Sequence, residues 1–162
     1  MKKINWQNLI IAVIIPLLVG GLSALFTRGG MEDFEAVSKP FLTPPSWLFP
    51  VAWSVLYILM GVASYIIFMS EDNRDKVPAA LTSYGVQLLV NFFWSILFFN
   101  LKVYLLSFAW LVLLWILIMM TMASFSKISK NAALLLLPYL LWVTFAGYLN
   151  LGVYILNWRN SL

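Results

Sequence analysis

The chain has 162 residues, of which 63% are apolar and only 10% are charged, and its formal net charge is +4. Soluble domains usually carry about 25% charged and about 45–50% apolar residues, so this composition excludes an ordinary soluble domain and indicates one stabilised by lipid. The sequence contains no Cys and no His, which removes disulfides, the usual ligands of zinc, copper and haem iron, and the commonest general base. We therefore expect neither a metal site nor a cofactor. The ten cations are scattered in short loops, so nucleic acid is not an expected partner.

Five long stretches without Asp, Glu, Lys or Arg divide the chain. A helix needs about 20 apolar residues to cross the hydrocarbon layer, and each stretch is long enough. The leucine-rich runs do not alternate as the strands of a β-barrel would. The sequence thus predicts an all-α membrane protein, a bundle of five transmembrane helices in a single domain over residues 1–162. The expected spans lie near 7–27, 47–69, 78–100, 103–124 and 133–156.

The first predicted span follows two lysines, as the apolar core of a signal peptide would. Its apolar stretch, from Leu9 to Phe26, is longer than the usual signal core of about 7–15 residues and is followed by more membrane, which favours a permanent span. A small-residue face on this span predicts close helix contact, and we interpret it as packing rather than chemistry. That face consists of Gly20, Gly21 and Ala24.

The longest predicted connection, residues 28–46, holds three acids, an amphipathic segment over Met31–Val37 and a Pro-rich end. Long loops in compact bundles are often functional, so this one is interpreted either as a lid or as a plain connector. The turn at Lys102 is so short that the spans on either side of it must be antiparallel neighbours.

The cations also give an expected orientation, because five spans place the two termini on opposite sides of the membrane. The rule that cytoplasmic loops carry more Lys and Arg favours a cytoplasmic N-terminus. The N-terminal side carries six cations and the other side four. The first set is Lys2, Lys3, Arg74, Lys76, Lys127 and Lys130, and the second is Arg28, Lys39, Lys102 and Arg159.

The predicted spans contain no ionisable acid or base, which argues against energised transport and against ion conduction through a charged ring. Polar and aromatic residues nevertheless recur at helical spacing on three of them. Amides within lipid need partners, so these faces are either interhelical glue or the walls of an aromatic cavity that suits planar apolar ligands. The stripes are Trp53, Tyr57, Gly61 and Ser64; Gln87, Asn91, Trp94 and Ser95; and Trp142, Ala146, Leu149 and Asn150.

The eight tryptophans divide by position along the spans. Three of them lie at span ends, where an interfacial aromatic belt explains them: Trp6, Trp47 and Trp158. Two more, Trp110 and Trp115, are interpreted as lipid-facing or core residues. The remaining three, Trp53, Trp94 and Trp142, are assigned to the candidate site.

The segment KPFLTPPSWLFPVAWSVLY, from Lys39 to Tyr57, together with Met60-Gly61, resembles the signature of the tryptophan-rich sensory protein (TspO/MBR) family. That family includes the mitochondrial translocator protein, also called the peripheral benzodiazepine receptor. Residues 87–99 resemble its third helix and residues 138–150 its fifth. The resemblance covers essentially the whole chain.

The resemblance implies a five-helix bundle, usually a homodimer, that binds porphyrins and synthetic benzodiazepine-type ligands in a pocket opened by the first loop. It also implies pocket contacts from six positions and a lid contact from Phe34. One departure is Leu42, which replaces a Trp that many members carry and would remove its contacts. With the stripes added, the candidate ligand-binding residues are Trp53, Tyr57, Gln87, Asn91, Trp94, Ser95, Trp142, Ala146, Leu149 and Phe34; the six implied by the resemblance are Trp53, Tyr57, Asn91, Trp94, Trp142 and Ala146.

The expected function is that of a multi-pass protein of a bacterial cell membrane that binds protoporphyrin-type tetrapyrroles and related planar hydrophobic molecules. It would act as a sensor, a regulator or a passive carrier, with lipid and a second copy of the chain as further partners. Two alternatives stay open, a light-dependent porphyrin-degrading enzyme and a transporter of tetrapyrroles or lipids. Turnover beyond one equivalent of porphyrin per protein would indicate the enzyme, and flux in sealed liposomes would indicate the transporter.

Overall fold

The computed structural model describes residues 4–158, except the side chains of residues 31 and 32. Within this part the secondary structure is helical and no strand occurs. The helices are α1 (Trp6–Ala36), α2 (Leu48–Phe68), α3 (Val77–Ser95), the π-helix η1 (Ile96–Asn100), α4 (Tyr104–Ser126), α5 (Lys130–Leu134) and α6 (Leu137–Asn157). Within the described residues, five segments are long and apolar enough to cross a membrane: Trp6–Gly30, Leu48–Phe68, Val77–Asn100, Tyr104–Ser126 and Lys130–Asn157. The predicted all-α fold with five transmembrane helices is confirmed.

The cations Lys2, Lys3 and Arg159, which entered the expected orientation, lie outside the described residues. The cytoplasmic N-terminus therefore stays a prediction.

Helix α1 is longer than the sequence predicted, because it continues through the first nine residues of the expected 28–46 loop. It ends at Ala36, and Val37 is already extended, three residues before Pro40, whose ring disfavours helix in the residue before it. The extra turns are held by Phe34, whose ring packs against those of Phe49, Phe98 and Phe99. The true connection is therefore short, and the Met31–Val37 segment belongs mostly to the helix.

The third span ends in a π-helical turn that the sequence did not predict. In η1 the Leu101 N–H donates to the Ile96 carbonyl at 3.0 Å, and the chain reverses through Lys102, which has a positive φ of 53°. The Asn100 side chain donates to the Phe26 carbonyl at 2.8 Å, which ties this turn to α1. The predicted neighbouring spans are confirmed, since α3 and α4 pack together along this reversal.

The fifth span is broken into α5 and α6 by a turn at Leu135–Leu136. Pro138 lies in the first turn of α6, where its missing N–H costs nothing, but it cannot continue a helix that starts upstream. Ser129 caps α5 by accepting a hydrogen bond from the Ala132 N–H at 3.3 Å. Both pieces still form one membrane-crossing segment.

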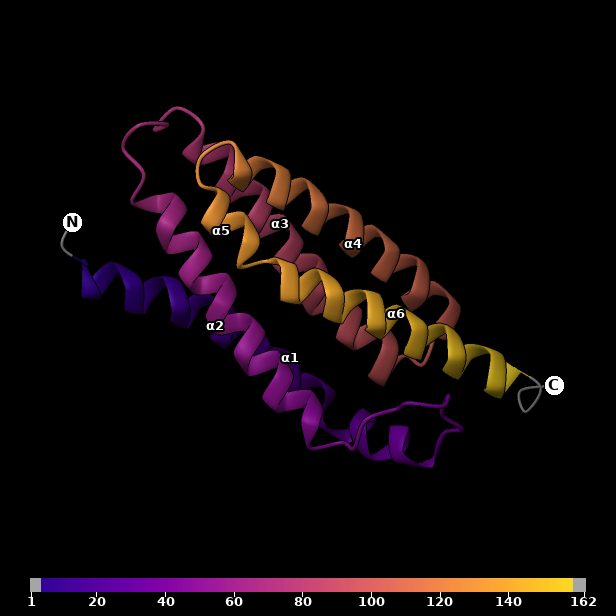
Figure 1. The fold of residues 1–162 in the computed structure, drawn as a ribbon. Helices are drawn as coiled ribbons and strands as arrows, with labels where there is room; N and C mark the ends of the chain where they lie inside the picture. Colours follow the sequence, from indigo (N-terminus) through magenta and orange to yellow (C-terminus); the bar gives the residue numbers. More distant parts are fainter. Residues whose placement is uncertain (1–3, 159–162) are drawn as a thin grey trace.

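The helices are arranged with α3, α4 and α6 running alongside one another, while α1 and α2 cross over each other beside them (Figure 1). Helix α1 also contacts α3 and η1, and α2 reaches α3 and α5. The start of α1 and the end of α6 lie at opposite ends of the bundle (Figure 1).

The core of the bundle combines apolar side chains with a small set of buried polar ones. Its largest fully buried members include Tyr139, Phe125, Met60, Leu114 and Gln87. Apolar side chains cover the outside, as expected for a surface that faces lipid. Inside, each buried amide or hydroxyl needs a partner, and these partners define the surroundings of the candidate site.

Candidate ligand-binding site

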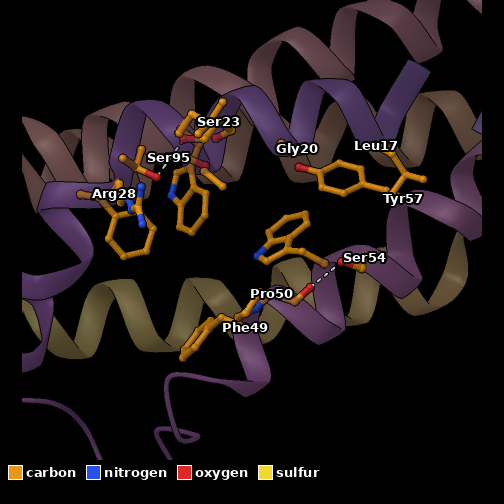
Figure 2. Close-up of a pocket in the computed structure, with 16 residues that line it drawn as sticks. Leu17, Gly20, Ser23, Arg28, Phe49, Pro50, Ser54, Tyr57 and Ser95 are labelled. Carbon is orange, nitrogen blue, oxygen red and sulfur yellow. Dashed lines mark hydrogen bonds between the residues drawn. The ribbon is translucent and has the colours of Figure 1, made fainter. Parts of the chain in front are cut away.

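A cavity of about 670 Å³ opens between α1, α2 and the end of α3. This volume is in the range of about 300–1,000 Å³ that is usual for small-molecule sites. Its wall is formed by Leu17, Gly20, Gly21, Ser23, Ala24, Leu25, Thr27 and Arg28 from α1, Phe49, Pro50, Trp53, Ser54 and Tyr57 from α2, and Trp94, Ser95 and Phe99 from α3 and η1. Figure 2 shows these side chains around the open space.

Three aromatic side chains give the cavity flat walls. The ring of Trp53 stacks on Tyr57 with centroids 5.5 Å apart and planes 29° apart. The same indole lies 6.3 Å from the ring of Trp94 and 6.1 Å from that of Tyr139. Trp53 lies eight residues, about two helical turns, after Pro45, so we expect it to lie below the membrane interface, where anchoring in an interfacial belt does not explain it.

The small residues of α1 form one wall of this space. A Cβ at Gly21 would meet nothing within 4 Å, whereas one at Gly20 would overlap the Tyr57 ring. The interpretation of Gly20, Gly21 and Ala24 as a packing face therefore needs correction. Gly20 does allow close packing against Tyr57. All three residues nevertheless line the cavity, because α1 and the ring of Trp53 are separated by open space along this face.

Gly61 has a different role from the one its position beside Trp53 and Tyr57 suggested. A Cβ there would overlap the α1 backbone at Ala12 and Val13. Gly61 is thus the point where α1 and α2 touch, and it does not line the cavity. The two helices meet at this glycine and diverge toward Trp53, which opens the space between them.

The two amides predicted on α3 lie behind the cavity wall. Asn91 donates from Nδ2 to the Tyr57 hydroxyl at 2.9 Å, while its buried Oδ1 has no hydrogen-bond partner within the described part of the chain. The Tyr139 hydroxyl donates to Gln87 Oε1 at 2.8 Å. Both amides join neighbouring helices, which favours the interhelical-glue interpretation for Gln87 and leaves one free acceptor on Asn91.

The α6 stripe lies on the far side of these residues. Trp142 packs its ring 6.1 Å from that of Phe49, so it touches a cavity residue without lining the cavity. Ala146 and Leu149 are buried within the bundle. Asn150 is satisfied locally, because its Oδ1 accepts from Ser107 at 3.1 Å and its Nδ2 donates to the Tyr104 carbonyl at 2.9 Å. Ligand contacts from Trp142, Ala146 and Leu149 stay predictions.

Phe34 covers one end of the site from the end of α1. Its centroid lies 5.5 Å from Phe98 and 5.6 Å from Phe99, and the Lys39 ammonium sits 5.1 Å above its face. Phe99 lines the cavity, so Phe34 contacts the wall from outside. This placement agrees with the lid interpretation, although a ligand contact from Phe34 stays a prediction.

The remaining connection, residues 37–47, is fixed to α6 by several contacts. The Asn157 amide donates to the Ser38 carbonyl at 2.9 Å and accepts from the Ser38 N–H at 3.2 Å. The Tyr148 hydroxyl donates to the Phe41 carbonyl at 2.6 Å. Leu42 stands at the position where the resemblance leads us to expect a Trp in many family members. Its side chain is exposed, its φ is 71°, and it does not line the cavity.

An ion pair joins the end of α1 to the α3–α4 turn. Lys102 Nζ donates to Asp33 Oδ2 at 2.7 Å, and this hydrogen bond raises the pKa of the Lys102 ammonium. Both side chains are about half exposed, so the pair positions the two segments and contributes little to stability.

Sequence reasoning missed several cavity residues, above all Thr27, Arg28, Phe49 and Phe99. Phe49 and Thr27 lie outside the three stripes of polar and aromatic residues that the sequence predicted as inward faces. Arg28 was read only as a loop cation, whereas it follows Gly21 by seven residues and so shares its helical face. The groups of His, Cys, Asp and Glu that a metal would need do not occur among residues 4–158.

These features define a class: a membrane-embedded helical bundle with an aromatic, mostly apolar cavity between its first three spans. The family model described as "TspO/MBR family" matches residues 12–156. The chain therefore belongs to the TspO/MBR family.

Curated relatives agree with this assignment over nearly their full length. The "Tryptophan-rich protein TspO" of Chlorobaculum tepidum is 38% identical over 94% of this chain and 99% of its own. The protein of the same description from Archaeoglobus fulgidus is 39% identical with the same coverage. The bovine "Translocator protein" is 35% identical over 90% of this chain and 87% of its own.

Proposed function

We propose that this protein binds protoporphyrin-type tetrapyrroles and similar planar hydrophobic molecules in the cavity between α1, α2 and α3, as a sensor, regulator or passive carrier. The observation that carries the proposal is the group of aromatic side chains, Trp53, Tyr57 and Trp94, that line a space of about 670 Å³. Planar ligands gain buried area and aromatic stacking on such walls.

The wall also explains why a large apolar ligand suits this site better than an ion or a sugar. The cavity lies between predicted membrane spans, where water is scarce. A polar ligand would lose its hydrogen bonds to water there, and the protein would have to replace each of them. Only a few hydroxyls and one cation are available for that in the lining. A ligand with a broad apolar face meets this requirement with few polar contacts.

The direct test is a screen of tetrapyrroles by quenching of tryptophan fluorescence in the purified protein. Saturable quenching at one equivalent of protoporphyrin per chain is expected, because Trp53 and Trp94 lie at the proposed site. Quenching that rises linearly without saturation, and is equal for an unrelated membrane protein, would contradict the proposal.

A bacterial cell membrane as host and a homodimer as assembly belong to the same proposal and rest on the resemblance. Cross-linking in native membranes should trap a dimer of the chain. A protein that stays monomeric in membranes, with porphyrin binding intact, would remove the dimer and keep the site.

Light-dependent degradation of the bound porphyrin is a second candidate. It is favoured by the close ring contacts that join Trp53 to Tyr57, Trp94 and Tyr139, since aromatic side chains next to an excited ligand can quench it or exchange electrons with it. Illumination of the complex with excess protoporphyrin decides between the two functions. Consumption of more than one equivalent per protein would support catalysis, and consumption of one equivalent or less would support binding alone.

A further inference from the structure

The candidate cavity is chemically different at its two ends. At one end the wall consists of Leu17, Gly20 and Tyr57, and at the other it includes Arg28 and Ser95 (Figure 2). Arg28 is the one charged side chain in the described lining. Leu17 and Arg28 are eleven residues apart on α1, which corresponds to about 16 Å along the helix axis. The space is therefore apolar along most of its length and cationic at one end.

Among the side chains that the structure describes, which do not include those of residues 31 and 32, Arg28 forms neither an ion pair nor a hydrogen bond. The nearby acids with described side chains are used elsewhere: Asp33 pairs with Lys102, and Glu35 accepts from the Ser46 hydroxyl at 2.9 Å. Arg28 is thus available to an anion that enters the cavity.

Two hydroxyls accompany Arg28 in the wall. The Thr27 hydroxyl donates to the Ser23 carbonyl at 2.9 Å, which leaves its oxygen lone pairs as acceptors. Ser95 lines the same end, and its hydroxyl donates no hydrogen bond to another described residue. A guanidinium with a hydroxyl donor beside it is a common arrangement for holding a carboxylate, because the planar fork matches the two oxygens.

An ordinary explanation for Arg28 exists, since Lys and Arg near span ends extend toward the membrane surface and help to set orientation. It accounts for a cation at this depth. It does not account for a cation whose side chain forms part of a cavity wall opposite Phe49 and beside Ser95. That second feature points to a ligand.

We propose that Arg28, assisted by Ser95, binds a carboxylate carried at one edge of the ligand, so that the site selects planar hydrophobic acids over their neutral analogues. The inference rests on the proposed porphyrin-binding function and specifies its substrate class. The propionic acid groups of protoporphyrin lie on one edge of the macrocycle, which places the charge at Arg28 while the ring lies against Trp53 and Trp94.

The test compares protoporphyrin IX with its dimethyl ester, which keeps the ring and removes both charges. Each is titrated in a neutral detergent against the parent protein, Arg28→Gln, Arg28→Lys and the control Arg74→Gln. Arg74 lies in the α2–α3 connection, where it donates to the Phe68 carbonyl at 3.0 Å, and it is outside the cavity wall. Melting temperatures of all four proteins are recorded alongside.

The parent protein should prefer the diacid about tenfold, the loss expected for one charge-assisted hydrogen-bonding contact. Arg28→Gln should bind both porphyrins equally, Arg28→Lys should keep part of the preference, and Arg74→Gln should keep all of it. Equal binding of diacid and ester by the parent, or an equal loss of both in Arg28→Gln, would overturn the inference while leaving porphyrin binding intact. Failure of the parent to bind either compound would overturn the proposed function itself.

Discussion

Similar stripes of small and aromatic residues occur in two regions of the bundle, but they border a cavity in one region and a packed core in the other. We define the cavity side as α1 and α2 and the packed side as α5 and α6. Among the five described spans, the buried share of the most apolar stretch is lowest in α1, at 11%, rises to 39% in α2 and is highest in α5–α6, at 50%. Stripes of small and aromatic residues at helical spacing occur on both sides. On the packed side they are filled by neighbouring side chains, whereas on the cavity side they leave space.

The difference arises from what each stripe faces. Ala146, Asn150 and Val153 on α6 are buried against α4, and Asn150 is held there by hydrogen bonds to Ser107 and Tyr104. Gly21 on α1 has no side chain opposite it within 4 Å. Helical spacing therefore identifies an inward face, but a cavity requires small residues on one helix to lie opposite large rings that do not reach them.

The largest expected effect is on ligand affinity at the centre of the cavity side. Trp53→Ala removes a ring that contacts Tyr57, Trp94 and Tyr139 and should weaken porphyrin binding by about 2 kcal/mol or more, roughly 30-fold. Trp53→Phe should recover part of this loss because a ring remains. Titration with protoporphyrin in detergent measures both.

The control for this prediction is Trp47→Phe, since Trp47 is exposed at the start of α2 and is absent from the cavity wall. It should bind porphyrin like the parent protein. Equal affinities for Trp53→Ala and the parent would assign Trp53 to core packing instead.

A second prediction compares a glycine at the contact between α1 and α2, Gly61, with one that faces the open cavity, Gly21. Gly61→Ala places a methyl group against the α1 backbone at Val13 and should cost about 1–3 kcal/mol of stability. Gly21→Ala meets open space and should leave stability unchanged or raise it by up to about 1 kcal/mol, because Ala is the better helix former. Thermal melting in detergent compares the two. A similar loss in both variants would mean that α1 packs closely along its whole inner face.

The third prediction concerns Asn91, which stands between the two regions. Asn91 Oδ1 has no hydrogen-bond partner among the described residues, and the prediction is that it accepts a hydrogen bond from the ligand. Asn91→Leu should then cost about 0.5–1.5 kcal/mol of binding, roughly a threefold to tenfold rise in the porphyrin dissociation constant. Affinity is measured on the folded fraction, with the melting temperature alongside. A lower melting temperature at unchanged affinity would make Asn91 interhelical glue only.

The smallest expected effect is that of a metal in the ligand. The sequence has neither His nor Cys, so iron in a bound haem would lack its usual axial ligands. Free-base protoporphyrin and haem should therefore bind with about the same affinity. Much tighter binding of haem, with a six-coordinate absorption spectrum, would show that another side chain ligates the iron.

The fold could be predicted largely from the sequence because lipid imposes a simple rule, namely that charge-free apolar stretches of sufficient length become helices. Span positions agree with the structure to within a few residues, apart from the continuation of α1 to Ala36 and the break before Leu137. Those two differences depend on tertiary contacts of Phe34 and on Pro138, which periodicity does not capture.

The candidate site could be predicted only in part. Trp53, Tyr57, Trp94 and Ser95 line the cavity, because each lies on the inward face of its helix. The sequence analysis did not predict that Gly20, Gly21 and Ala24 of α1 line the cavity. Glycine and alanine occur both where helices pack closely and where a cavity opens, and the sequence alone does not show which side chain lies opposite them. The cation at Arg28 was missed because its role depends on α1 remaining helical beyond residue 27.

The central claim, that porphyrin lies in the cavity between α1, α2 and α3, is tested most directly by filling that cavity from its open wall. Gly21 and Gly85 are both helical glycines at which an added Cβ meets nothing within 4 Å, but Gly21 lines the cavity and Gly85 lies on the outer face of α3. Protoporphyrin titration of Gly21→Leu should show binding lost or weakened at least tenfold, with Gly85→Leu unchanged and both proteins melting near the parent temperature. Unchanged affinity in a folded Gly21→Leu protein would contradict the account and place the ligand elsewhere.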